Sequence, residues 1–121
     1  MLVSKEFTFD AAHFLTKYKG KCENLHGHTY RLRITVEGPI GEDDMVMDFV
    51  VLKKLVNEKI VDKMDHVNLN DLFENPTAER MAEWIWEQLE DAPEFDGAGV
   101  LHLYEVKLWE GLGSFVTYRG E

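Results

Sequence analysis

The segment His28-Thr29-Tyr30-Arg31-Leu32-Arg33-Ile34-Thr35-Val36-Glu37 alternates between apolar and polar residues from Tyr30 onwards. Successive side chains of an extended strand point to opposite faces, so the apolar members share one face. These members are Tyr30, Leu32, Ile34 and Val36. We therefore predict a strand over 28–37 with one buried and one polar side, as in an antiparallel sheet.

The same period recurs near both ends of the chain. Over 3–14 it predicts a strand with Phe7, Phe9, Ala11 and His13 on one face. Residues 100–110 and 114–119 are typical of a closing hairpin. In its first arm the apolar residues change phase between 103 and 106, which predicts a bulge near Tyr104–Glu105. We expect a loop over 17–27 and a short extended segment over 45–49.

Two segments between these strands have a helical period instead. Their apolar residues predict one helix from about 52 to 64 and a second over 78–89. Asn75-Pro76-Thr77 is typical of a helix start, with Pro76 in the first turn and either Asn75 or Thr77 as the cap. The expected buried stripes are Leu52, Leu55, Val56, Ile60 and Met64, then Ala78, Met81, Ala82, Ile85 and Leu89.

The order strand, strand, helix, helix, strand, strand predicts an α+β fold, with residues 1–121 as a single domain. In this fold a four-stranded antiparallel sheet is covered on one face by two helices. Such a sheet keeps two unpaired edges, which an oligomer could bury by joining sheets. We therefore expect a homo-oligomer.

Composition narrows the class of protein. The 121 residues are 45% hydrophobic and carry a formal net charge of −10, which argues against a nucleic-acid partner. No apolar run approaches the ~20 residues of a membrane span, and the N-terminus lacks a signal-peptide pattern. We expect a cytoplasmic protein without membrane contact. A basic group is either a solvated loop or a contact for phosphates, and consists of Lys17, Lys19, Lys21, Arg31 and Arg33.

Histidines indicate a metal site. In His26-Gly27-His28 the two imidazoles lie on the same side of an extended backbone, and Gly27 leaves room beside them. His13, at the end of the neighbouring strand's apolar face, is either a core residue or a third ligand. Three neutral imidazoles suit Zn²⁺ and leave an open fourth position, which is a catalytic arrangement, whereas structural sites more often have four protein ligands. Cys22, the only cysteine, is a candidate ligand or base, or else a small buried residue.

Two further groups are candidates for the same site. Asp65-His66 is either an acid–base pair in which the carboxylate orients the imidazole, or two exposed polar loop residues. Glu110 ends an apolar strand beside Gly111, where it either accepts from a ligand with paired N–H donors or is an ordinary strand-end glutamate. Neither pattern alone decides between these interpretations.

Six motifs, in order along the chain, carry a resemblance to a known family. They are Phe9-Asp10-Ala11-Ala12-His13, residues 22–30, Met45-Val46-Met47-Asp48-Phe49, Met64-Asp65-His66-Val67-Asn68-Leu69-Asn70, Asn75-Pro76-Thr77-Ala78-Glu79 and residues 106–110. The chain resembles the 6-pyruvoyltetrahydropterin synthase family, and within it the 6-carboxytetrahydropterin synthases of queuosine (7-deazaguanine) biosynthesis. The resemblance implies a tunnelling fold (T-fold), in which three subunits join their sheets into a barrel and two trimers stack as a homohexamer.

The resemblance also implies roles for residues of this sequence. His13, His26 and His28 match the family's zinc ligands. Cys22 matches its catalytic cysteine, and Asp65 with His66 its catalytic dyad. Glu110 matches the glutamate that anchors the pterin, and Thr77 and Glu79 lie in a motif near the pterin pocket. The implied substrate is 7,8-dihydroneopterin triphosphate, and the implied products are 6-carboxy-5,6,7,8-tetrahydropterin, acetaldehyde and triphosphate, with zinc as the Lewis acid.

The sequence leaves open which pterin product the chain would form. The three-residue gap between Cys22 and His26 resembles the carboxytetrahydropterin branch, whereas pyruvoyl-forming animal enzymes typically have a longer gap. Glu23 beside Cys22 resembles members that form 6-hydroxymethyl-7,8-dihydropterin for folate synthesis with a glutamate base, alone or as a second activity. Otherwise Glu23 is a solvated loop residue. A non-catalytic pterin- or metal-binding module is the alternative from a different class of protein.

Overall fold

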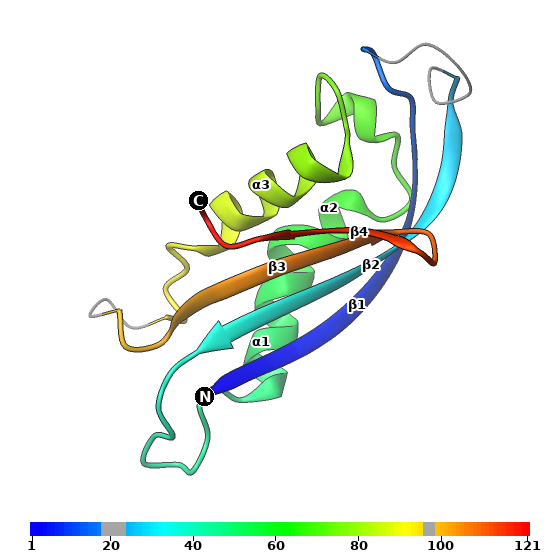
Figure 1. The fold of residues 1–121 in the computed structure, drawn as a ribbon. Helices are drawn as coiled ribbons and strands as arrows, with labels where there is room; N and C mark the ends of the chain where they lie inside the picture. The colour runs from blue at the N-terminus through cyan, green and yellow to red at the C-terminus, as the bar shows by residue number, and fades with distance from the viewer. Residues whose placement is uncertain (18–23, 96–98) are drawn as a thin grey trace.

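The computed structural model describes residues 1–17, 24–95 and 99–121. Its strands are β1 (Leu2–His13), β2 (His26–Glu37), β3 (His102–Glu110) and β4 (Ser114–Tyr118), and its main helices are α1 (Phe49–Val56), α2 (Asp62–Met64) and α3 (Ala78–Leu89). The strands form one antiparallel sheet in the order β1-β2-β3-β4, with the helices on one face (Figure 1). The predicted α+β architecture is confirmed.

The strand register brings the apolar faces of β1 and β2 together. Residues that pair directly across an antiparallel ladder point to the same face of the sheet. The register pairs Ala11 with His28 and His13 with His26, so all four side chains lie on the helix-facing side. The predicted apolar face of β2 is fully buried and consists of Tyr30, Leu32, Ile34 and Val36.

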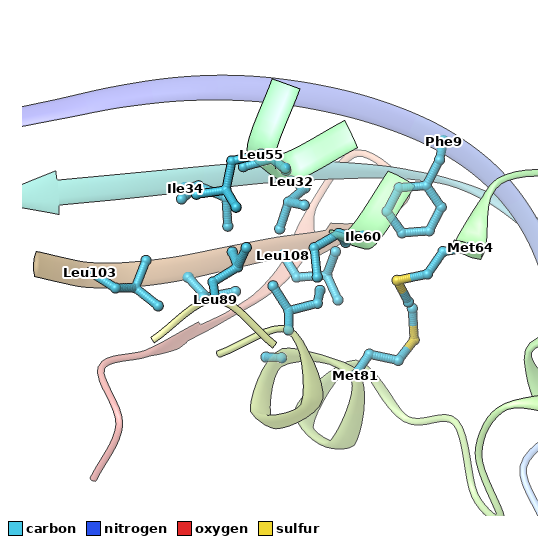
Figure 2. Close-up of a cluster of buried hydrophobic side chains, with 14 of the residues drawn as sticks. Phe9, Leu32, Ile34, Leu55, Ile60, Met64, Met81, Leu89, Leu103 and Leu108 are labelled. Atoms are coloured by element: carbon cyan, nitrogen blue, oxygen red, sulfur yellow. The ribbon is translucent and has the colours of Figure 1, made fainter. Parts of the chain in front are cut away.

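The hydrophobic core lies between the sheet and the helices (Figure 2). Every residue of the two predicted helical stripes is buried. The side chains labelled in the close-up are Phe9, Leu32, Ile34, Leu55, Ile60, Met64, Met81, Leu89, Leu103 and Leu108. The sheet is therefore fixed against the helices over most of its length, and the histidines lie where this apolar packing ends.

Side-chain caps set the starts of the two main helices. Asp48 Oδ1 accepts from the Val50 N–H at 2.8 Å and caps α1. The expected extended segment over 45–49 is therefore wrong, since its last residue already begins a helix. Thr77 Oγ1 accepts from the Arg80 N–H at 3.1 Å, so Thr77 is the cap of α3. Pro76 precedes this cap and does not lie in the first turn as predicted.

The first predicted helix and the last hairpin each contain one irregularity. Between α1 and α2 the helix widens into a π-helical segment, Asn57–Val61, which accommodates an extra residue in the turn. In the sheet, Thr35 pairs with Glu105 and Val36 with Leu103, so Tyr104 is the extra residue of the predicted bulge. No helix in the described part of the chain is long and apolar enough to cross a membrane.

Candidate metal centre

Three histidines meet at one end of the sheet and form what we call the histidine centre: His13, His26 and His28. His13 ends β1, and the other two begin β2. One ring nitrogen from each lies within 4.8 Å of those of the other two. The structure thus brings together the three residues that the sequence predicted as ligands.

Main-chain carbonyls orient two of the rings. His13 Nδ1 lies 2.7 Å from the Pro76 carbonyl oxygen, and His26 Nδ1 lies 2.7 Å from that of Asn24. Because a carbonyl oxygen only accepts, each Nδ1 carries the proton and donates it. The lone pair of each neutral ring is then on Nε2, which is the tautomer that a metal ligand of this kind requires.

Two other ring nitrogens of the histidine centre are buried without hydrogen-bond partners among the described residues. Nε2 of His13 and Nε2 of His28 are both buried, and neither makes a hydrogen bond to any residue that the structure describes. An unsatisfied buried polar atom costs about 1–3 kcal/mol, and a bond to a metal ion would remove this penalty. Burial lowers the pKa of His28, His13 and His26 lower it further, and Glu110 opposes them. Neutral imidazole is the form that binds metals, so the donor set fits a divalent ion such as Zn²⁺.

Tyr30 lies beneath the histidine centre. Its hydroxyl oxygen is 3.3 Å from His13 Nδ1, and its ring meets those of His13 and His28 edge-on. Burial and the nearby Glu110 carboxylate raise the pKa of Tyr30, so the hydroxyl stays protonated. The alternation along the strand predicts Tyr30 only as a core residue. Its position two residues after His28, on the same face of the strand, was the signal for a place beside the histidine centre.

Glu110 lies against the histidine centre. The β2–β3 register pairs it with Tyr30, which puts its side chain on the helix-facing side. Its Oε1 is 3.2 Å from His28 Nε2 and 4.0 Å from His13 Nε2. A cavity of about 350 Å³ begins at this carboxylate and is lined by Leu15, Thr77, Ala78, Glu79, Glu110, Ser114, Phe115 and Val116. The structure therefore brings together the three residues predicted to lie near a pterin.

Asp65 and His66 lie beside the edge of β1. Asp65 Oδ1 accepts from the Asp10 N–H at 3.0 Å, and the His66 N–H donates to the Asp10 carbonyl oxygen. His66 Nδ1 is 2.9 Å from Asp65 Oδ1. The hydrogen bond from Asp10, and then that from His66, lower the pKa of the Asp65 carboxyl group. The predicted pairing of these two side chains is therefore present, with Asp65 in its ionised form at neutral pH.

The conformation and exposure of His66 suggest a functional side chain rather than a core residue. His66 has φ of 58°, a left-handed conformation that is uncommon outside glycine. Its side chain is 78% exposed. It borders a shallow hollow of about 570 Å³ that His28 also lines. His28 and His66 thus line the same hollow, and His28 Nε2 also lies 3.2 Å from Glu110 Oε1.

Two members of the basic group predicted from the sequence, Arg31 and Arg33, lie apart from this site. Arg31 and Arg33 lie on the sheet face opposite to the histidines, where both form ion pairs with Glu6. The Arg31 guanidinium lies 3.9 Å above the ring of Trp109. These two arginines therefore do not provide a phosphate contact beside the histidine centre. Residues Lys19, Lys21, Cys22 and Glu23 lie outside the described residues.

The fold matches that of T-fold proteins, and the family comparison places the chain among pterin-metabolising enzymes. The chain belongs to the 6-pyruvoyl tetrahydropterin synthase family, whose model matches residues 2–121. It is 40% identical over 124 residues to the 6-carboxy-5,6,7,8-tetrahydropterin synthase of Synechocystis, covering 97% of this chain and 92% of the relative.

Two further relatives have other names. The chain is 43% identical over 105 residues to the dihydroneopterin monophosphate aldolase of Pyrococcus furiosus, covering 86% of this chain and 84% of the relative. It matches the structure of Caenorhabditis elegans 6-pyruvoyl tetrahydropterin synthase with a TM-score of 0.85 at 29% identity, covering 100% of this chain and 96% of that chain. These similarities support a function of the tetrahydropterin synthase type.

Proposed function

We propose that the chain is a zinc-dependent lyase that converts 7,8-dihydroneopterin triphosphate into 6-carboxy-5,6,7,8-tetrahydropterin, releasing acetaldehyde and triphosphate. The observation that carries the proposal is a cavity lined by Thr77, Glu79 and Glu110, whose Glu110 carboxylate lies 3.2 Å from His28 Nε2 of the histidine centre. A pterin in this cavity would lie next to the candidate metal site. The Synechocystis relative, matched over nearly its whole length, supports this product.

The cavity residues suit a pterin ring. The Glu110 carboxylate can accept from paired N–H donors on the aminopyrimidine edge, in the geometry of two parallel hydrogen bonds. Thr77 Oγ1 already accepts from the Arg80 N–H, so its own proton remains available to a ligand. Phe115 and Val116 supply apolar surface for the ring faces. A zinc ion bound at the adjacent histidine centre would supply Lewis-acid polarisation to the substrate.

Proton transfer is assigned to the Asp65–His66 pair. With Nδ1 of His66 donating to Asp65, its Nε2 is free to take a proton from a substrate in the hollow shared with His28. The ionised Asp65 then stabilises the imidazolium that forms. Cys22 is the proposed second base. Since His66 is exposed in a single chain, we propose that a homo-oligomer covers this hollow and excludes water from it.

A second candidate function is the formation of 6-hydroxymethyl-7,8-dihydropterin. The relative from Pyrococcus furiosus favours it, because its name describes an aldolase that acts on dihydroneopterin monophosphate. Glu23, next to Cys22, would be the base in that reaction. Formation of 6-pyruvoyl tetrahydropterin is a third outcome, suggested by the structural relative of that name.

The deciding experiment is to incubate the zinc-loaded protein with 7,8-dihydroneopterin triphosphate and to identify the pterin by mass. A 6-carboxy product with acetaldehyde supports the proposal, whereas a 6-hydroxymethyl or 6-pyruvoyl product replaces it. Cys22→Ala and Glu23→Gln form a matched pair: the first should abolish the carboxy product and the second should leave it. A folded, zinc-loaded sample without turnover would refute the enzyme assignment and leave a binding module.

A further inference from the structure

The β3–β4 hairpin ends in an apolar side chain that the described part of the chain does not cover. Leu112 lies in the turn between the two strands and is 103% exposed. A Cβ atom placed on either of its neighbours, Gly111 or Gly113, would meet no described atom within 4 Å. Single exposed leucines are common on protein surfaces. This one is informative because of its position relative to the two open edges of the sheet.

The first open edge belongs to β1, which is an outer strand of the sheet (Figure 1). Main-chain N–H and C=O groups point alternately to the two sides of a strand. Those of Asp10 point away from the sheet, where they bond to Asp65 Oδ1 and to the His66 N–H. The groups of Thr8 and Glu6 therefore point the same way, and they have no main-chain partner on that side among the described residues. A further strand can pair with β1 only as far as the residue before Asp10.

The second open edge belongs to β4. The Gly111 N–H donates to the Thr29 carbonyl oxygen at 3.1 Å, so the odd-numbered residues at this end of β3 direct their main-chain groups towards β2. The even-numbered ones face β4 and pair there with residues such as Val116. By the same alternation, Phe115 and Thr117 direct their main-chain groups outwards.

These two edges fit each other in one register. Two copies that join edge to edge must match both the direction of the main-chain groups and the face of the side chains. Thr8 of one copy opposite Phe115 of a second copy satisfies both conditions. The same register pairs Phe7 with Val116, which are partly buried apolar residues on the helix-facing side. The bonds at Asp10 block a shift in one direction, and a shift in the other separates this apolar pair.

In this register the hairpin turn of the second copy runs on past the last strand pair, and its Leu112 falls level with Ala11. That alanine lines the hollow beside His66 together with Val67, so the hollow offers apolar surface to a leucine. We propose that Leu112 of one copy packs against the Asp65–His66 turn of a second copy and covers this hollow. The copy thus contributes a residue to its neighbour's site. The consequence, exclusion of water from an imidazole that transfers protons, rests on the proposed function.

Photo-crosslinking tests the contact directly. The photoreactive residue p-benzoylphenylalanine replaces Leu112, and crosslinked dimers are separated by denaturing electrophoresis and mapped by mass spectrometry. The crosslinks should lie in residues 64–68 of the second copy. The same residue in place of Val50, which is 73% exposed on α1, is the control and should not reach that segment. Crosslinks from position 112 only to other segments, or no dimers at all, would overturn the proposal.

Two variants test whether the leucine itself is needed. Leu112→Ser should weaken self-association at least about tenfold in sedimentation, because it removes the apolar burial, whereas Leu112→Met should remain near the wild type. At concentrations where the Leu112→Ser protein is still oligomeric, diethyl pyrocarbonate should modify its His66 faster than that of the wild type. His102, at the opposite end of the sheet, should react equally in both. Equal association of the two variants, or equal rates at His66, would refute the contact.

None of these measurements requires turnover. A confirmed contact in a protein without enzymatic activity would retain the role of Leu112 and refute only the proposed function. An active enzyme whose Leu112→Ser variant associates like the wild type would refute only the role of Leu112.

Discussion

Replacing Asn70 with alanine should loosen the chain segment that follows His13. The Phe14 N–H donates to Asn70 Oδ1 at 2.9 Å, and Asn70 Nδ2 donates to the Phe14 carbonyl oxygen at 3.0 Å. This side chain thus extends the edge of β1 by one residue beyond His13, a member of the histidine centre. Asn75 makes one comparable bond, in which its Oδ1 accepts from the Thr16 N–H at 3.0 Å.

The number of hydrogen bonds that each substitution removes gives the expected loss in the free energy of unfolding. A neutral hydrogen bond that is partly accessible to water contributes about 1 kcal/mol to the free energy of unfolding. Asn70→Ala should therefore cost about 2 kcal/mol and Asn75→Ala about 1 kcal/mol. For a chain of 121 residues, 1 kcal/mol corresponds to a change in Tm of about 3–5 °C. The two variants should melt about 8 °C and about 4 °C below the wild type.

Thermal unfolding of the metal-free proteins, followed by circular dichroism, measures these values. Chelator competition then measures zinc affinity, which should fall more for Asn70→Ala because Phe14 adjoins His13. Equal melting temperatures for the two variants, or a shift below about 2 °C for Asn70→Ala, would show that these bonds do not hold the end of β1.

Four other outcomes are expected. Leu32→Ala should lower the free energy of unfolding in urea by about 2–5 kcal/mol, since Leu32 is fully buried; a loss below 1 kcal/mol would contradict the described core. Thr77→Ala should cost about 1 kcal/mol by removing the cap of α3, and Thr77→Ser should restore most of it. Zn²⁺ at a hundred times its Kd should raise the free energy of unfolding by about 2.7 kcal/mol, and no rise in Tm would exclude a site in the folded state. The pKa of Glu6 is lowered from its usual 4.5, mainly by Arg33 and also by Arg31. This pairing therefore stabilises the fold above pH 4.5, and the stabilisation is lost as the pH falls through the lowered pKa. The advantage of the wild type over Glu6→Gln, at most about 1 kcal/mol at this exposed site, should thus be present at pH 7 and absent in strong acid.

The sheet could be predicted from the sequence because one face of each strand is buried. The alternation along β2 predicted that Leu32 and Ile34 lie on the face that meets the helices. The change of phase in β3 predicted the bulge at Tyr104. The π-helical segment Asn57–Val61 left no such trace, since the spacing of buried residues remains helical through it. The segment ending at Phe49 was misjudged because a single capping bond from Asp48 outweighs a short apolar pattern.

The histidine centre was only partly predictable. His26 and His28 are recognisable from their spacing, and His13 from its place at the end of an apolar face. The position of Glu110 beside them depends on the register between β2 and β3, which pairs it with Tyr30 and which no local pattern specifies. The position of Glu110 therefore follows from contacts across the sheet and not from the spacing of residues along the chain.

The acceptors that orient His13 and His26 belong to the main chain at Pro76 and Asn24. Every amino acid carries a carbonyl, so a substitution at position 24 or 76 changes a side chain and leaves the acceptor in place while the backbone path is kept. A centre oriented by carboxylate side chains would lose a partner through a single codon change. Substitutions at these two positions are therefore compatible with an unaltered tautomer of His13 and His26, provided that the backbone keeps its course.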